Sequence, residues 1–183
     1  MQIDSGLERK FSRFGKTLKV TGGVEIEGYA SLFGQSDQGG DVVMKGAYAA
    51  SLAALKAQGQ HVKMLWQHDA SEPIGVWDAV HEDSQGLYVK GRLLESVARG
   101  REAAALIAAG ALDGLSIGYR TKRSKRGKDG TRYLVELELW EVSLVTFPML
   151  VNARVGAKAE TKEQDDLELR ELAGVLRGAI SQM

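Results

Sequence analysis

Three polar residues interrupt otherwise apolar, alternating segments of this chain, and their types suit a serine nucleophile: His68, Ser116 and Glu141. A serine hydroxyl becomes a nucleophile at neutral pH when a neighbouring base removes its proton. Imidazole supplies such a base, and a carboxylate orients the imidazole and stabilises the imidazolium that forms. The three residues therefore form a candidate triad, although none of them is decisive alone.

His68 ends the segment 62–68, and alternation puts it on the more apolar face of that segment. A packed histidine with one satisfied nitrogen is the structural alternative to a base. The other histidines, His61 and His81, have polar surroundings near expected turns. No two histidines have the spacing of a metal motif, and cysteine is absent, so we expect neither a metal site nor a cofactor.

Ser116 lies in Gly-Leu-Ser-Ile-Gly at 114–118, which matches the G-x-S-x-G pattern of the α/β-hydrolases. In those enzymes the histidine follows the serine, whereas every histidine of this chain precedes it. The segment also continues as a strand. On a strand, Ser116 shares a face with two glycines, so we expect it to be uncovered and open to a substrate carbonyl. The alternative is that the glycines make room for a packed neighbour.

Glu141 occupies the largely apolar row of the segment 133–147, whereas Glu136 and Glu138 fall on the opposite face. A carboxylate in a buried register is costly unless it is paired, so it requires a partner. A histidine held in one tautomer is such a partner. A bulge near Trp140 would reverse the alternation and leave Glu141 in solvent, which is the alternative.

A mainly β chain must position these residues. Alternation predicts strands at 24–33, 62–68, 74–80, 87–94, 115–121 and 133–147, and helical spacing predicts helices at 44–57 and 97–109. The polar segment 1–23 is expected to be partly loose. Two helices are too few for repeated βαβ units. We therefore expect an α+β fold that is mainly β, an antiparallel β-barrel with helices packed outside.

Length and composition set the domain organisation. The 183 residues fit one domain of about 150 residues plus a tail. We place the domain at 1–155, followed at 156–183 by a linker and an amphipathic helix. The net charge of zero argues against a protein that coats nucleic acid. No apolar run approaches the roughly 18 residues of a membrane span, and the N-terminus lacks the apolar region of a secretory signal.

A basic segment at 120–132 contains seven Lys and Arg residues. A solvated hairpin is the default interpretation, and docking on an acidic scaffold or capsid segment is the alternative. Aromatic residues do not interleave with these charges, so the segment does not resemble a platform for single-stranded nucleic acid.

Four motifs resemble, in order along the chain, those of the tailed-phage prohead (head maturation) protease family. They are IEGYASLFG at 26–34 followed by Asp37, GD at 40–41 and KGAY at 45–48; LWQHD at 65–69 followed by PIG at 73–75; GLSIGY at 114–119; and WEVSLVTFP at 140–148. The resemblance covers roughly residues 8–155. That family is related to the herpesvirus assembly serine proteases, so the resemblance implies their antiparallel barrel ringed by helices.

The resemblance also implies roles for the candidate residues. His68 would be the general base, Ser116 the nucleophile and Glu141 the orienting acid, where the herpesvirus relatives have a histidine. After Phe-Pro the family often has a small residue and then Asn-Pro, whereas this chain has Met-Leu-Val at 149–151. The oxyanion hole would then be formed by Arg154 or by backbone amides around Asn152.

The implied function is that of a serine endopeptidase of viral head maturation. It would cleave the scaffold portion of the major capsid protein, and then itself, inside the prohead in the cytoplasm of a bacterial host. Its partners would be that capsid protein and its scaffold segment, with a homodimer or higher oligomer among the expected states, and neither a membrane nor a specific nucleic acid. The alternatives are another barrel-type serine hydrolase, such as an esterase, and a non-catalytic scaffold or assembly chaperone.

Overall fold

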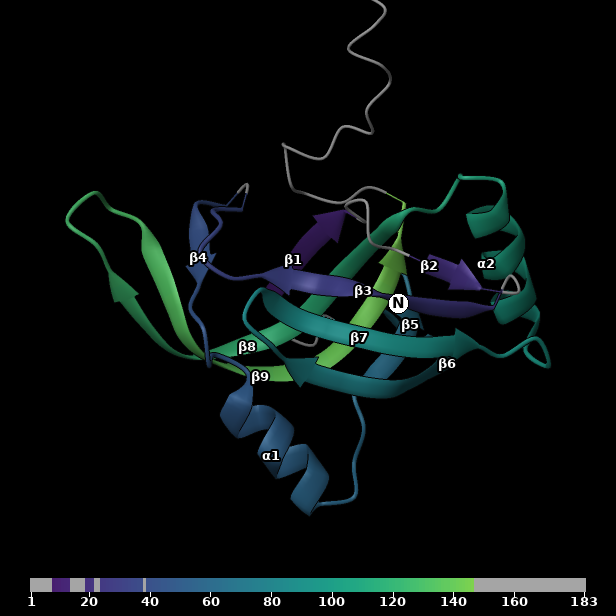
Figure 1. Ribbon diagram of the computed structural model, residues 1–183, viewed down its shortest axis with the longest axis horizontal. Coiled ribbons are helices and arrows are strands. Elements are labelled where there is room, and N and C mark those ends of the chain that lie inside the picture. Colours follow the sequence, from purple (N-terminus) through teal and green to yellow (C-terminus); the bar gives the residue numbers. More distant parts are fainter. Residues whose placement is uncertain (1–7, 14–18, 22–23, 38, 147–183) are drawn as a thin grey trace, which may run out of the picture. The chain divides into compact units, whose positions relative to one another are not determined.

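The computed structural model describes residues 8–13, 19–21, 24–37 and 39–146, all within the unit Met1–Ala153. These residues form one nine-stranded sheet and two helices (Figure 1). The strands are β1 (Glu8–Arg13), β2 (Lys19–Thr21), β3 (Glu25–Leu32), β4 (Asp41–Val43), β5 (Lys63–Trp66), β6 (Asp69–Glu82), β7 (Gly86–Leu93), β8 (Gly114–Arg126) and β9 (Arg132–Val145). The helices are α1 (Ala49–Ala57) and α2 (Ala98–Ala108). The sheet curls into a half-barrel, so the predicted mainly β fold is confirmed.

The strand order places β9 between the two strands that lead to the other candidate residues. The order is β1-β8-β9-β5-β6-β7-β3-β2, and β4 pairs separately with β9. β9 runs antiparallel to β8 but parallel to β5 and β4. Segments that lie far apart in the sequence therefore meet across β9: the strand before His68 on one side and the strand of Ser116 on the other.

One face of the sheet carries the apolar core. Leu115 and Ile117 on β8 and Val142 and Leu144 on β9 are fully buried and belong to this core. Because side chains alternate along a strand, the intervening residues Ser116 and Ser143 lie on the other face. The candidate site and the core therefore share the same two strands.

The two helices cover separate parts of the sheet (Figure 1). α1 packs against β9, where the Leu139 N–H donates a 2.9 Å hydrogen bond to Ser51 Oγ, and α2 packs against β6 and β7. Both helices end before a glycine with positive φ, Gly59 at 62° and Gly110 at 70°. Glycine adopts this backbone conformation without a steric penalty, so both predicted helix stops are confirmed.

Two parts of the chain have more strand than the sequence predicts. The segment 1–23 contains β1 and β2, which pair with β8 and β3 at the ends of the strand order. These short strands form by backbone pairing with neighbouring strands, and their sequences show little alternation of apolar and polar residues. The strand predicted at 115–121 continues to Arg126.

The predicted linker and C-terminal helix at 156–183, and the oxyanion candidates Asn152 and Arg154, lie outside the described residues. Within the described ranges, no helix has the length and apolar character needed to cross a membrane.

Candidate active site

The register between β8 and β9 brings the serine motif beside the Glu141 motif. Ser116 lies directly opposite Ser143, and Gly118 lies directly opposite Glu141. Directly opposite residues of an antiparallel pair point to the same face, with Cβ atoms about 4.5–5.5 Å apart. Ser116, Ser143 and Glu141 therefore share one face of the sheet.

His68 occupies a tight turn, so its prediction as the last residue of an alternating strand was wrong. Trp66 on β5 pairs with Asp69 on β6, and only Gln67 and His68 connect them. Both have positive φ, 50° and 66°, as in a type I′ hairpin turn. For residues other than glycine this conformation costs about 1–3 kcal/mol each, and it persists where surrounding contacts hold it.

Contacts with β9 hold the turn in place. The Gln67 N–H donates to Leu144 O at 3.0 Å, and Gln67 Nε2 donates to Thr146 Oγ1 at 2.6 Å. The His68 N–H donates to Ser143 Oγ at 3.2 Å. The backbone that presents the imidazole is therefore attached to the strand that carries Glu141.

His68 and Glu141 are in direct contact. His68 Nδ1 lies 2.5 Å from Glu141 Oε1, and both side chains are only about 5% exposed. A hydrogen bond to a carboxylate requires the proton on Nδ1, which leaves the Nε2 lone pair as the proton acceptor. This tautomer is the one that a general base for a serine needs.

Glu141 is buried, although β9 has a bulge at Trp140, the position at which the sequence analysis considered one. The pairing moves from Gly118–Glu141 to Tyr119–Leu139, which leaves Trp140 as the extra residue. Trp140 is 44% exposed, and the Arg120 guanidinium lies over its ring, whereas Glu141 is only 5% exposed. The bulge therefore turns Trp140, and not Glu141, towards solvent.

Asp69 follows His68 directly but is engaged elsewhere. The hydroxyl and the N–H of Ser71 both donate to Asp69 Oδ1, and these bonds hold the pKa of that carboxyl below its usual value. Glu141 is thus the carboxylate that contacts the imidazole.

Ser116 is fully buried, so the expectation that its hydroxyl is uncovered was wrong. The space above Gly118 is filled by the Glu141 carboxylate: a Cβ built on Gly118 would lie 2.2 Å from Glu141 Oε1. For Gly118, the alternative considered from the sequence holds, since the glycine makes room for a packed neighbour.

Ser143 is a contact residue that the sequence analysis left without a role. Its side chain is fully buried, and its hydroxyl donates to Glu141 Oε2 at 2.5 Å. In the sequence, Ser143 could have been found from its position two residues after Glu141, which puts both side chains on the same face of a strand.

No group of three metal-ligating side chains occurs in the part of the chain that the structure describes.

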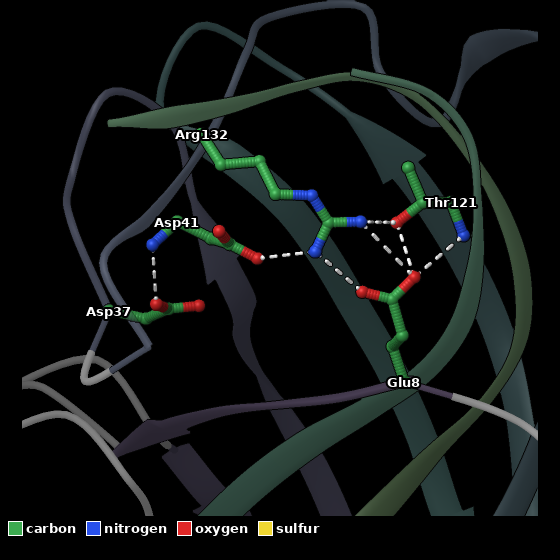
Figure 2. Close-up of polar contacts among 5 residues, drawn as sticks. All are labelled: Glu8, Asp37, Asp41, Thr121 and Arg132. Carbon is green, nitrogen blue, oxygen red and sulfur yellow. Dashed lines mark hydrogen bonds and ion pairs between the residues drawn. The ribbon is translucent and has the colours of Figure 1, made fainter. Parts of the chain in front are cut away.

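Most of the basic residues on the β8–β9 hairpin have partners. Lys122 lies 2.8 Å from Glu138, Arg123 lies 3.4 Å from Glu136, and Arg120 stacks on Trp140. Arg132 bridges Glu8 and Asp41 at 2.9 and 3.1 Å (Figure 2). These pairs favour the interpretation of the segment as a solvated hairpin.

A buried histidine–carboxylate pair beside a serine, on a curled β-sheet, is an arrangement typical of serine hydrolases. Comparison with known proteins defines the class further. A family model described as caudovirus prohead serine protease matches residues 15–167. The chain therefore belongs to the caudovirus prohead serine proteases, the proteases of viral head maturation.

Two known proteins are similar to this chain, one in sequence and one in fold. The prohead protease of Enterobacteria phage HK97 is 32% identical over 159 residues, which cover 85% of this chain and 68% of the phage protein. The solved structure of the bacteriophage T4 capsid assembly protease is similar in fold, with a TM-score of 0.62 and 16% identity. That match covers 78% of this chain and 98% of the T4 chain.

Proposed function

We propose that Ser116, His68 and Glu141 are the catalytic triad of this prohead protease. The observation that carries the proposal is the 2.5 Å contact between His68 Nδ1 and Glu141 Oε1 in a buried setting. It is supported by the register, which puts Ser116 on the same face as Glu141.

In the proposed mechanism, Ser116 Oγ attacks the carbonyl carbon of the scissile peptide while His68 Nε2 takes the hydroxyl proton. Glu141 stays ionised and stabilises the imidazolium. The imidazolium then gives its proton to the leaving amine, and the peptide C–N bond breaks. Water attacks the acyl-enzyme with His68 again as base, which releases the acid product and regenerates the serine hydroxyl. By the family resemblance, the oxyanion would be bound by Arg154 or by backbone amides around Asn152.

The proposed substrates are the scaffold portion of the major capsid protein and the protease itself, inside the prohead. The names of the two similar proteins support this, since one is a prohead protease and the other a capsid assembly protease. In this proposal, residues 1–155 are the peptidase domain. Residues 156–183 are a linker and a helix that binds the scaffold region.

One observation favours a second candidate function. The full burial of Ser116 is compatible with a non-catalytic assembly chaperone that has kept the residues of a triad. The two candidates predict different products, so one experiment separates them.

The experiment is co-expression with the capsid protein of the same genome, read by the intact masses of both chains. Wild type should shorten the capsid protein, whereas Ser116→Ala should leave it at full length, since loss of a triad serine costs on the order of 10⁶ in rate. Ser31→Ala is the matched control, because Ser31 is also a buried strand serine, only 1% exposed, outside the candidate triad. Processing by Ser116→Ala at the wild-type rate would exclude Ser116 as nucleophile. Unprocessed capsid protein with wild type would favour the chaperone.

A further inference from the structure

We propose that Ser143 is a positioning residue for this active site, a proposal that rests on the catalytic roles proposed for His68 and Glu141. The Ser143 side chain is fully buried between the strands that carry the other residues. It pairs with Leu65 on β5 on one side and with Ser116 on β8 on the other.

The Ser143 hydroxyl contacts both partners of the histidine–carboxylate bond. Its single proton is donated to Glu141 Oε2 at 2.5 Å, and its oxygen accepts the His68 N–H at 3.2 Å. Together with the 2.5 Å contact between His68 Nδ1 and Glu141 Oε1, these bonds close a ring of three residues. One hydroxyl therefore fixes the rotation of the carboxylate and the backbone that presents the imidazole.

The turn at His68 explains why the His68 N–H bonds a side-chain oxygen and not a backbone carbonyl of β9. The Gln67 N–H continues the ladder to β9 by donating to Leu144 O. The next N–H, that of His68, leaves the ladder because the chain reverses with positive φ at both residues. Ser143 Oγ supplies an acceptor at that point, and the resulting bond restrains a conformation that is unfavourable for histidine.

Removal of the hydroxyl should disturb orientation more than folding. Gln67 would remain attached to β9 through Leu144 and Thr146, so the turn should persist. Glu141 Oε2 and the His68 N–H would each lose a partner in a buried setting, and buried polar groups do not stay unpaired. The carboxylate is then expected to rotate, or water to enter, with loss of the fixed Nδ1 contact.

The test compares wild type with Ser143→Ala, Ser143→Thr and Ser51→Ala. Ser51→Ala is the matched control, because Ser51 also accepts a backbone N–H of β9, that of Leu139, from the distant helix α1. One readout is the rate of covalent labelling of Ser116 by a fluorophosphonate at saturating probe. Ser143→Ala should lower this rate about 10- to 100-fold, the range known for groups that orient metal ligands, with little change in the half-saturating concentration. Ser143→Thr should restore much of the rate, and Ser51→Ala should leave it unchanged.

The second readout does not depend on catalysis. A histidine Nδ1 proton held by a carboxylate gives a proton NMR resonance far downfield of the amides, assigned by its loss in His68→Gln. Ser143→Ala should broaden or shift this resonance, and Ser51→Ala should not. An unchanged resonance with wild-type labelling in Ser143→Ala would overturn the proposal. If wild-type Ser116 is labelled neither at micromolar protein concentration nor in assembled proheads, the proposed triad fails, whereas the resonance still decides whether Ser143 positions the His68–Glu141 pair.

Discussion

Gly118 and Glu141 lie directly opposite each other on β8 and β9, and the Glu141 carboxylate occupies the space that a side chain at position 118 would fill. The three atoms nearest to a Cβ built on Gly118 all belong to the Glu141 side chain: Oε1 at 2.2 Å, Cδ at 2.9 Å and Cγ at 3.0 Å. The second glycine of the serine motif therefore controls where the carboxylate lies, and through it the orientation of His68.

Gly118→Ala should leave the fold intact and remove most of the proteolytic activity. The nearest atoms to the added methyl are the flexible end of one side chain, so Glu141 can move away, but its contact with His68 is then lost. The measurements are capsid-protein processing and the thermal unfolding midpoint. Gly39→Ala is the control, since a Cβ there meets only Asp37 Oδ1, at 3.3 Å. Wild-type processing by Gly118→Ala would contradict the role assigned to the Glu141 contact.

Glu141→Gln should lower the rate by about 10⁴, as for the equivalent change in other serine proteases, and so less than loss of the serine. A neutral amide neither holds the imidazole in the required tautomer nor stabilises the imidazolium. The residual rate should rise with pH, because only the neutral imidazole acts as a base. Glu138→Gln is the control on the same strand, where the carboxylate contacts Lys122 instead. Full activity of Glu141→Gln, with loss of activity in an Asp69 variant, would show that another residue is the acid.

Much of the site could be predicted from local patterns. Alternation gave the strands around Ser116 and Glu141 and predicted that Glu141 would be buried and need a partner. The buried histidine–carboxylate contact agrees with this expectation, although the bulge at Trp140 puts Glu141 on the face opposite Leu139 and the core. The mainly β fold followed from the number and spacing of the alternating segments.

The remaining features depend on contacts that no local pattern encodes. A type I′ turn is normally signalled by Asn-Gly or a similar pair, whereas here Gln67 and His68 adopt it because β9 holds them. The burial of Ser116 and the two bonds of Ser143 depend on which strands are neighbours, which is a property of the whole sheet. β1 also forms by pairing with a distant strand, β8.

The stability of the sheet near β1 should fall at acid pH because of Glu8. Burial raises the pKa of its carboxyl, but hydrogen bonds from Arg132 and Thr121 and the charge of Arg132 outweigh burial and hold the pKa below its ordinary value of 4.5 (Figure 2). A lowered folded-state pKa gives a contribution that is fully present above the unfolded-state pKa and is lost as the pH falls through the folded-state pKa. The measurement is the unfolding midpoint of wild type and Glu8→Gln, from about pH 6 down to about pH 3.

The midpoint of Glu8→Gln should lie below that of wild type near neutral pH, and the two should converge in acid. Glu136→Gln is the control, because its partner Arg123 is more exposed, and exposed ion pairs contribute little. A constant difference between Glu8→Gln and wild type across this pH range would contradict the assigned role of the ionised carboxylate.

The burial of Ser116 predicts that the free, dilute protein is a poor enzyme. A peptide carbonyl reaches Ser116 Oγ only if the covering groups move, so the structure represents a state with low access to the nucleophile. Anything that binds an open state more tightly shifts the population towards it, and a second copy or a capsid partner at high local concentration would do so. Specific activity should therefore rise with enzyme concentration from nanomolar to micromolar, and rise further inside assembled proheads. Ser116→Ala measured in parallel gives the background cleavage. A specific activity that is constant over this range, and equal to that inside proheads, would mean that small local fluctuations are enough to expose Ser116.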